Sequence, residues 1–427
     1  MVIFLKTSFH ILNAQTHSKG VKRMSNDFRR VKVIDSMRGF SLFGILLANM
    51  LIFQYGIYGK DMIHLFSLSP SDSAAYVFLK VAVEESFMPI FTFLFGYSMV
   101  KLKESLERRQ LGVKRHFFRR FLLLLGFGLL HGVFLWEGDI LTFYGMMGVF
   151  LLLFFLNRKA KTLLVWASML LILTGAAGYG SLNDNMYLLS DKQTLTTYVK
   201  DTIHVYGSGT YEQIKDHRNN VDPVNMAGYK FAFAFLFTPF IMGALFLFGM
   251  YAGKEKWFYD VSANQKQYGR WAAALIPLGL LLKGTMYLWP DANWAGATHM
   301  LGGSLLSLGY IAGFAWLYAK CEKSFLMKAF ESVGRISLSN YLMQTVICTT
   351  IFYGYGLGYF GKLGMIAGIF VCIGIYGIQL IGSYMYVQKF KTGPVEKLLR
   401  IWTNFSWSGK PKEKKALPIE VNHPFVG

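Results

Sequence analysis

The chain has 427 residues, of which 53% are hydrophobic, 17% aromatic and only 16% charged. Soluble globular domains carry about 25% charged residues, so this composition excludes an ordinary soluble enzyme, a disordered chain and a disulfide scaffold. A net charge of +20 is also found in nucleic-acid-binding proteins, so the positions of the cations have to be established first.

Apolar stretches long enough to cross a bilayer, about 20 residues as a helix, recur along the chain. They lack the apolar–polar alternation of a barrel strand. Two of them are short, and we expect the second stretch to continue a helix that begins near Ala74. The sequence therefore predicts an all-α, polytopic membrane protein with about ten transmembrane helices, over residues 37–58, 86–100, 117–136, 140–156, 162–180, 229–252, 270–289, 296–320, 337–357 and 363–386.

The Lys and Arg residues lie mainly on one side of this arrangement. The termini and the connections on that side contain 35 of them, whereas the connections on the other side contain 6. Cytoplasmic loops are enriched in Lys and Arg, so both termini are predicted to be cytosolic. The cations flank membrane spans, which predicts contact with membrane lipids and no nucleic-acid partner.

The membrane domain is expected to cover residues 31–405, between a cytosolic N-terminal extension (1–30) and a disordered cytosolic tail (406–427). Residues 181–228 form the long extracytoplasmic loop, whose polar and aromatic content suggests a cap. Residues 1–23 differ from the rest, which leaves translation from Met1 or from Met24 open. The three cysteines have no ligand spacing, so neither a disulfide framework nor a metal site is predicted.

Polar groups inside two spans suggest a functional site, because ionisable groups are costly at membrane depth. Arg38 and Asn49 are eleven residues apart in the first span, as are Arg120 and His131 in the third. Eleven residues return a helix to within about 20° of its starting direction and rise roughly 16 Å, comparable to an extended pantetheine arm. Each helix thus carries a guanidinium near the cytosol and a second polar group in its outer half, and Gly128 is expected to leave room on that face.

The connection after the third span places His131 before a short turn, with Asp139 after the turn and Tyr144 in the fourth span. A tight hairpin would bring His131 and Asp139 together. A carboxylate bonded to one imidazole nitrogen fixes the tautomer and leaves the other nitrogen free as a base. We therefore predict a general base at His131, oriented by Asp139; the alternative is a histidine that only bonds a neighbouring helix.

Other polar groups have two interpretations each. The ninth span carries a polar stripe with Asn340 and Gln344, which either lines a ligand site or bonds another helix. His299, near the outer end of the eighth span, is either a substrate-binding or an interfacial residue. Glu84 and Glu85 either serve chemistry or face water, and Lys283 is expected to extend to an interface.

Four arginines lie at the predicted cytosolic side, where guanidinium forks can bind phosphates: Arg38, Arg119, Arg120 and Arg335. Arg119 and Arg120 could instead be simple positive-inside anchors. A cytosolic anionic donor that reaches a base in the outer half would need this division of charge. A transporter would also need polar groups midway, so the pattern does not decide between them.

Several motifs occur in order across roughly residues 31–405: Val33-Ile-Asp35-Ser-Met-Arg38-Gly39, Phe93-Leu-Phe95-Gly96, Leu130-His131-Gly132, Trp136-Glu-Gly-Asp139 and Ser339-Asn340-Tyr341-Leu-Met-Gln344. Together they resemble the bacterial YeiB-like family, a domain of unknown function. That family is similar to membrane acyltransferases that move acyl groups from cytosolic acyl-CoA to extracytoplasmic sugars, such as the lysosomal heparan glucosaminide acetyltransferase. The resemblance implies a bundle of ten or eleven helices and a histidine-dependent transfer.

We therefore expect an acyltransferase of the bacterial plasma membrane. It would move a short acyl group, acetyl in the first place, from cytosolic acyl-CoA to an extracytoplasmic hydroxyl or amine of a sugar or envelope glycan. The arginines would hold the donor phosphates, and Asn49, Asn340 or Gln344 would donate to the developing oxyanion. A thioester is already activated, so no metal is required, and a homo-oligomer is possible. The alternatives are a proton-coupled transporter or lipid-handling protein and a non-catalytic membrane partner.

Overall fold

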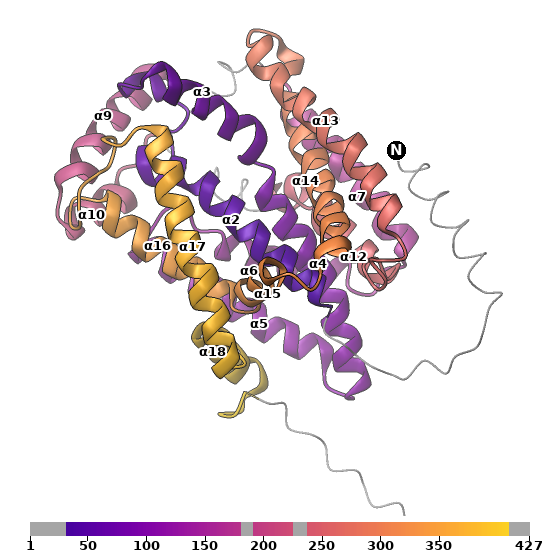
Figure 1. Ribbon diagram of the computed structural model, residues 1–427. Coiled ribbons are helices and arrows are strands. Elements are labelled where there is room, and N and C mark those ends of the chain that lie inside the picture. The colour runs from indigo at the N-terminus through magenta and orange to yellow at the C-terminus, as the bar shows by residue number, and fades with distance from the viewer. Residues whose placement is uncertain (1–30, 181–190, 225–236, 410–427) are drawn as a thin grey trace, which may run out of the picture.

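The computed structural model describes residues 31–180, 191–224 and 237–409. These ranges contain fifteen α-helices and no strand (Figure 1). Residues 1–30 with the alternative start at Met24, the end of the tail, and parts of the 181–228 loop and of the sixth predicted span lie outside them. The helices are α2 (Lys32–Tyr55), α3 (Pro70–Phe78), α4 (Phe87–Arg108), α5 (Val113–Phe134), α6 (Leu141–Phe154), α7 (Ala160–Ala177), α9 (Lys192–Ser208), α10 (Tyr211–Asn220), α12 (Ala244–Lys254), α13 (Gln265–Leu288), α14 (Asn293–Cys321), α15 (Phe325–Arg335), α16 (Ser337–Phe352), α17 (Met365–Lys389) and α18 (Pro394–Asn404), with the short helices η1 (Ile63–Leu65) and η2 (Leu79–Val83).

The helices confirm an all-α, polytopic membrane protein. Each of the ten predicted spans coincides with helix over most of its described residues. Six helices are long and apolar enough to cross a membrane, namely α2, α5, α7, α13, α14 and α17, and α6 is apolar but shorter.

Helix α2 lies at the centre of the bundle, in contact with α4, α15, α16 and α17 (Figure 1). Close approach is possible because glycines lie at the crossings. A Cβ added at Gly39 would come within 2.1 Å of the Phe330 carbonyl oxygen on α15, and one at Gly96 within 2.0 Å of the Phe246 carbonyl oxygen on α12. Small residues at such crossings are typical of packed membrane helices, where no hydrophobic force acts between helices.

The prediction of one continuous helix from near Ala74 into the second span is wrong. Helix η2 ends at Val83 and α4 begins at Phe87, after three non-helical residues. Glu85 has a φ of 57°, in the left-handed region that residues other than glycine rarely adopt. This interruption turns the carboxylates of Glu84 and Glu85 toward cationic groups of the neighbouring elements.

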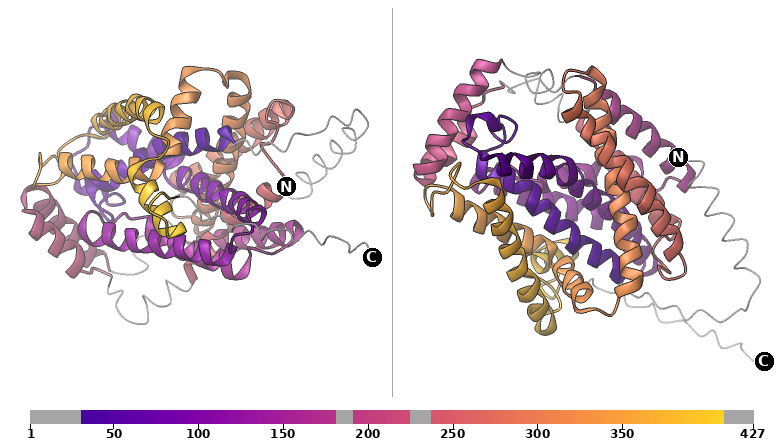
Figure 2. Two further views of the ribbon diagram at one scale, coloured as in Figure 1. Left: turned by 90° about the horizontal axis from the view of Figure 1, so that it is seen from below. Right: turned by 45° about the horizontal axis from the view of Figure 1, so that its top comes forward.

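Helices α9 and α10 cover one end of the bundle (Figure 2). The Arg218 guanidinium donates to the carbonyl oxygens of Val133 and Leu135 at 2.8 and 3.1 Å. The Tyr206 hydroxyl donates to Glu137 at 3.2 Å. The described part of the 181–228 loop therefore forms a cap over the turn between α5 and α6, as its composition suggested.

Helix α18 lies at the end opposite to α9 (Figure 1). It packs against the first turns of α5 and α16, where the Trp402 indole donates to the Arg119 carbonyl oxygen at 3.0 Å. Segments that were predicted to be cytosolic thus meet at one end, and the predicted extracytoplasmic loop lies at the other. Which end faces the cytosol stays a prediction.

Candidate active site

A cavity of about 240 Å³ lies where α2, α4, α5, α6, α16 and α18 meet. Along α2 and α5 its lining changes from charged to apolar residues. Helix α2 contributes Arg38 and then Leu42 and Ile45, and α5 contributes Arg120 and then Leu124. The cavity therefore has a cationic mouth and an apolar depth. The remaining lining residues are Phe91, Phe95, Ser98, Ile140, Leu141, Tyr144, Gly334, Arg335, Ser337, Leu338, Tyr341, Glu396, Leu399 and Arg400.

The mouth brings together three of the four predicted arginines, Arg38, Arg120 and Arg335, and adds Arg400. Arg38 donates to Asp35 at 2.9 Å and to Ser98 at 2.7 Å. The Arg120 guanidinium has neither a hydrogen bond nor an ion pair with any described residue, although it lies near Arg38 and Arg400. A guanidinium among like charges is a ready binding site for an anion.

The only carboxylate among the lining residues belongs to Glu396, and it is already engaged. One oxygen accepts the backbone N–H groups of Leu338 and Ser339 at 2.8 and 3.1 Å, and the other accepts the Ser339 hydroxyl at 2.6 Å. Glu396 therefore caps the N-terminus of α16, where the helix dipole favours negative charge. Glu396 therefore attaches α18 to the cavity mouth. Because its carboxylate is occupied by α16, the mouth keeps an excess of positive charge from its arginines.

The turn between α5 and α6 brings His131 and Asp139 together, as predicted. The imidazole Nδ1 lies 2.8 Å from the carboxylate of Asp139. That carboxylate also accepts the backbone N–H groups of Leu141 and Thr142 at 3.1 and 2.8 Å, so it caps α6. The acid is fixed by the helix that it caps, and it fixes the imidazole in turn. His131 is buried, with 3% of its surface exposed.

The prediction that the second imidazole nitrogen is free is wrong. Nε2 lies 3.1 Å from the hydroxyl of Thr345, a buried residue of α16 that the sequence analysis did not single out. A signal was present, because Ser337, Tyr341 and Thr345 recur every four residues and share one face of a helix. The predicted stripe also begins at Ser337, but it continues through Asn340 and Gln344, which lie one residue before Tyr341 and Thr345 and about 100° around the helix from them.

Tyr341 separates the cavity from the His131–Asp139 pair. It lines the cavity, its ring centroid lies 5.5 Å from that of His131, and its hydroxyl donates weakly to the Gly138 carbonyl oxygen at 3.4 Å. The expected room beside Gly128 is absent. A Cβ at this glycine would lie 2.1 Å from the Thr142 nitrogen, because α5 and α6 are in direct contact there.

The other predicted site residues lie elsewhere, apart from Tyr144, which lines the cavity. Asn340 donates to Ser383 at 2.9 Å and Gln344 donates to Gln379 at 2.8 Å, so both bond α17, as the helix–helix interpretation predicted. Asn49 is partly buried on α2 and is not part of the cavity lining. Arg119 points to a separate surface hollow, where its guanidinium lies 4.0 Å from the centroid of the Phe405 ring.

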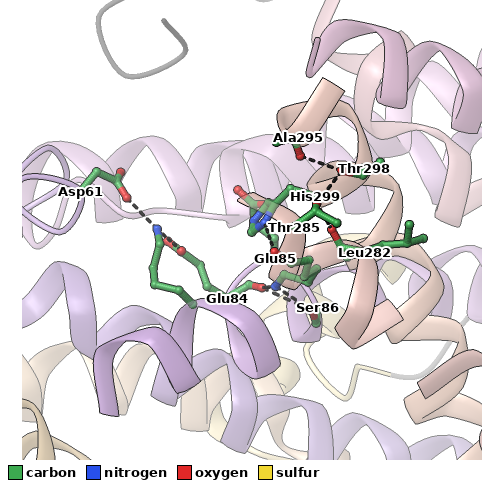
Figure 3. Close-up of polar contacts among 12 residues, drawn as sticks. Asp61, Glu84, Glu85, Ser86, Leu282, Thr285, Ala295, Thr298 and His299 are labelled. Carbon is green, nitrogen blue, oxygen red and sulfur yellow. Dashed lines mark hydrogen bonds and ion pairs between the residues drawn. The ribbon is translucent and has the colours of Figure 1, made fainter. Parts of the chain in front are cut away.

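His299 belongs to a second polar region, where the helix is interrupted between η2 and α4 (Figure 3). We call this region the charge cluster; it consists of His299 with Lys60, Asp61, Lys80, Glu84, Glu85 and Lys283. Its Nε2 lies 3.3 Å from the carboxylate of Glu85, and its Nδ1 lies 3.2 Å from the Lys283 carbonyl oxygen. Lys283 does not extend to an interface as predicted. It is fully buried, and its ammonium group donates to the Glu84 carbonyl oxygen and to the Ser86 hydroxyl.

The rest of the charge cluster is a closed ring of four side chains. Lys60 contacts Asp61 at 2.8 Å and Glu84 at 2.7 Å. Lys80 contacts Asp61 at 2.6 Å and also pairs with Glu84. Each ammonium group thus lies against both carboxylates, which compensates every charge of the ring.

The chain is similar in sequence to a family of known proteins. Residues 252–406 match the family described as a protein of unknown function (DUF418). The chain is 33% identical over 402 residues to the uncharacterized protein YxaH of Bacillus subtilis, an alignment that covers 90% of this chain and 97% of the relative. It is 27% identical to the uncharacterized protein YeiB of Escherichia coli, over 86% of this chain and 94% of that protein.

Proposed function

Because the chain belongs to the YeiB-like DUF418 family of membrane proteins, whose named relatives are described as uncharacterized, we propose a function from its own site. The proposed reaction is the transfer of a short acyl group from cytosolic acyl-CoA to an extracytoplasmic hydroxyl or amine, such as that of a sugar or envelope glycan. The proposed location is the bacterial plasma membrane. The observation that carries the proposal is the guanidinium of Arg120, unpaired among the described residues, at the mouth of a cavity whose lining residue Tyr341 packs against His131.

The cavity suits one part of such a donor. Its four arginines match phosphate groups, and its apolar depth matches a slender acyl-bearing arm. At about 240 Å³ it accommodates that arm and not a whole nucleotide, so the nucleotide would lie outside the mouth. The order of the lining, arginines first and then Ile45, Phe91 and Tyr144, would orient the thioester toward the outer half.

The His131–Asp139 pair supplies what acyl transfer then requires. With Nδ1–H donated to Asp139, the neutral imidazole keeps a lone pair on Nε2, which can take the proton of the attacking group. The carbonyl carbon gains the new bond, the thiolate leaves, and the imidazolium returns the proton to the sulfur. A general base in this role contributes about 10²–10⁴-fold in rate.

The test is binding and turnover of labelled acetyl-CoA by the purified full-length protein in detergent. Arg120→Gln should weaken binding at least about tenfold, the equivalent of 1.4 kcal/mol. The matched control is Arg119→Gln, because the neighbouring arginine points away from the cavity and its loss should leave binding unchanged. His131→Gln should bind normally and lose transfer. Binding by the wild type no stronger than by Arg120→Gln would overturn the proposal.

One observation favours a second candidate, a proton-coupled transporter or lipid-handling protein. The helix interrupted between η2 and α4, with charged groups gathered at the break, resembles the discontinuous helices at which transporters bind substrates. Solute uptake into proteoliposomes that requires a proton gradient, and that Glu85→Gln abolishes while Arg120→Gln does not, would favour this function over acyl transfer.

A further inference from the structure

A hydroxyl, an imidazole and a carboxylate follow one another in a hydrogen-bonded series formed by Thr345, His131 and Asp139. The Thr345 Oγ1 lies 3.1 Å from Nε2 of His131, and Nδ1 lies 2.8 Å from Oδ1 of Asp139. We propose that Thr345 is a nucleophile that carries the acyl group as an ester between its arrival from the donor and its departure to the acceptor. This inference rests on the proposed acyl transfer and adds to it a covalent intermediate on a named atom.

The hydrogen bonds around Asp139 fix where the protons lie. An ionised carboxylate only accepts, and this one already faces two backbone N–H groups, so Nδ1 of His131 has to donate to it. A neutral imidazole then has a lone pair on Nε2, and the Thr345 hydroxyl donates to it. The competing acceptor, the Tyr341 carbonyl oxygen one turn back, lies farther away at 3.4 Å. The proton of Thr345 is thus directed at the base that would remove it.

The position of Thr345 along α16 suits a carrier between two sides. One turn toward α18, Tyr341 lines the arginine cavity. Two turns in the other direction α16 ends at Phe352, and the ring of the next residue, Tyr353, packs against that of Tyr206 in the cap with the centroids 4.7 Å apart. Thr345 therefore lies between the region open to the proposed donor and the region covered by the α9–α10 cap.

The same position argues against direct transfer. Tyr341, His131 and Thr345 are all buried, with 3%, 3% and 1% of their surfaces exposed, so none of these three side chains borders an open path from the cavity to the cap. Donor and acceptor can then react in turn more readily than side by side. The contacts of Tyr341 that close the cavity are long, since its hydroxyl lies 3.3 Å from the Ile140 nitrogen and 3.4 Å from the Gly138 carbonyl oxygen. Movement of this one ring would expose Thr345 to the donor, as gating side chains do in other enzymes.

Both half-reactions balance without a further reactant. In the first, Oγ1 attacks the thioester carbonyl carbon, its proton moves to Nε2, the C–S bond breaks, and the thiolate takes the proton to leave as CoA–SH. In the second, the acceptor oxygen or nitrogen attacks the ester carbonyl carbon, His131 takes its proton, and the C–O bond to Thr345 breaks as that proton returns to Oγ1.

The experiment uses the full-length protein in detergent, labelled acetyl-CoA and no acceptor. With label in the acetyl group, we expect release of up to one CoA–SH per protein and an acid-stable label on the peptide that contains Thr345. With unlabelled acetyl-CoA and added labelled CoA, we expect exchange of that label into acetyl-CoA. Thr345→Ser should still form the ester. Thr345→Val, which keeps the shape, should bind acetyl-CoA normally and lose ester, exchange and transfer by at least about a hundredfold, the lower range for loss of a catalytic group.

Thr349→Val is the matched control, because Thr349 is a buried threonine of the same helix whose hydroxyl donates to the Val346 carbonyl oxygen and interacts with Tyr355 rather than with His131. It should keep all three activities. Transfer by Thr345→Val at the wild-type rate, or wild-type transfer with neither ester nor exchange, would overturn the covalent carrier and leave the acyltransferase standing. Absence of any acetyl-CoA binding and transfer would overturn both.

Discussion

The charge cluster contains three lysines and three carboxylates, whereas the arginine cavity contains four arginines and one glutamate. In the cluster, Lys60 and Lys80 each touch both Asp61 and Glu84. In the cavity, Arg120 faces other arginines, and the one carboxylate is occupied by α16. Compensated charges hold elements together, whereas an excess of one sign favours a ligand of the other sign. The two regions therefore differ less in how many charged side chains they contain than in whether those charges are paired with opposite charges.

Removal of one carboxylate from the closed ring tests its structural role most strongly. Glu84→Ala leaves the buried Lys80 and the half-buried Lys60 with only Asp61 between them, and breaking a buried ion pair in this way costs up to about 3–5 kcal/mol. We expect the free energy of unfolding, measured by denaturant titration in mixed micelles, to fall by that amount.

A second glutamate provides the control for Glu84→Ala. Glu104 pairs with Lys101 on the surface end of α4 at 3.0 Å, with 37% of its side chain exposed. Exposed pairs contribute about 0–1 kcal/mol, so Glu104→Ala should unfold almost as the wild type does. Equal losses in the two variants would show that the closed ring has no special role.

Removing a charge from the cavity should not lower the stability of the protein, in contrast to removing one from the ring. Arg120→Gln removes a cation that lies near Arg38 and Arg400, so the variant should unfold at the same or a higher temperature than the wild type. Sulfate or inorganic pyrophosphate should stabilise the wild type, by about 2.7 kcal/mol at a hundred times the dissociation constant. The thermal shift should disappear in Arg120→Gln and persist in Arg119→Gln. A shift of the same size in all three proteins would mean that the anion acts elsewhere.

The sequence was informative about elements and about local pairs. Hydropathy predicted where the helices lie, and the short turn after α5 predicted the contact between His131 and Asp139, because eight residues in a hairpin leave few alternatives. Three of the four arginines predicted at the cytosolic side line the cavity, since Arg38 and Arg120 lie within the first turns of α2 and α5 and Arg335 ends α15.

Contacts between distant segments were not predictable in the same way. Thr345 is 214 residues from His131, and its pairing depends on how α16 is rotated against α5. The sequence pattern gave one polar stripe on α16, with Asn340 and Gln344, and could not say whether it lined a ligand site or bonded another helix. Likewise, nothing local indicated that Lys283 would reach the Glu84 carbonyl oxygen, because that bond requires the helix to be interrupted between Val83 and Phe87.

The smallest expected effect concerns a titratable group in the cap. His217 of α10 is stacked on Tyr198, and its Nε2 lies 2.8 Å from the Thr202 hydroxyl. Burial lowers the pKa of His217 below its usual 6.5, and the nearby Asp201 and Asp216 offset this only in part. The neutral imidazole therefore stabilises the docked cap.

The sign of the pH effect follows from that shift. A histidine whose pKa is lowered by folding binds a proton more readily when the cap is open, so its stabilisation is complete above about pH 6.5 and is lost as the pH falls through the lowered pKa. Hydrogen exchange of residues 211–220, corrected for its intrinsic pH dependence, should therefore accelerate between pH 7.5 and 5. His217→Gln should remove this acceleration, whereas replacement of the exposed His204 on α9 should not. Each ammonium group of the ring keeps two carboxylate partners over this pH range, so hydrogen exchange in α4 should not accelerate. If it accelerated in α4 as much as in α10, the distinction between a closed ring and a cap held by a neutral side chain would be contradicted.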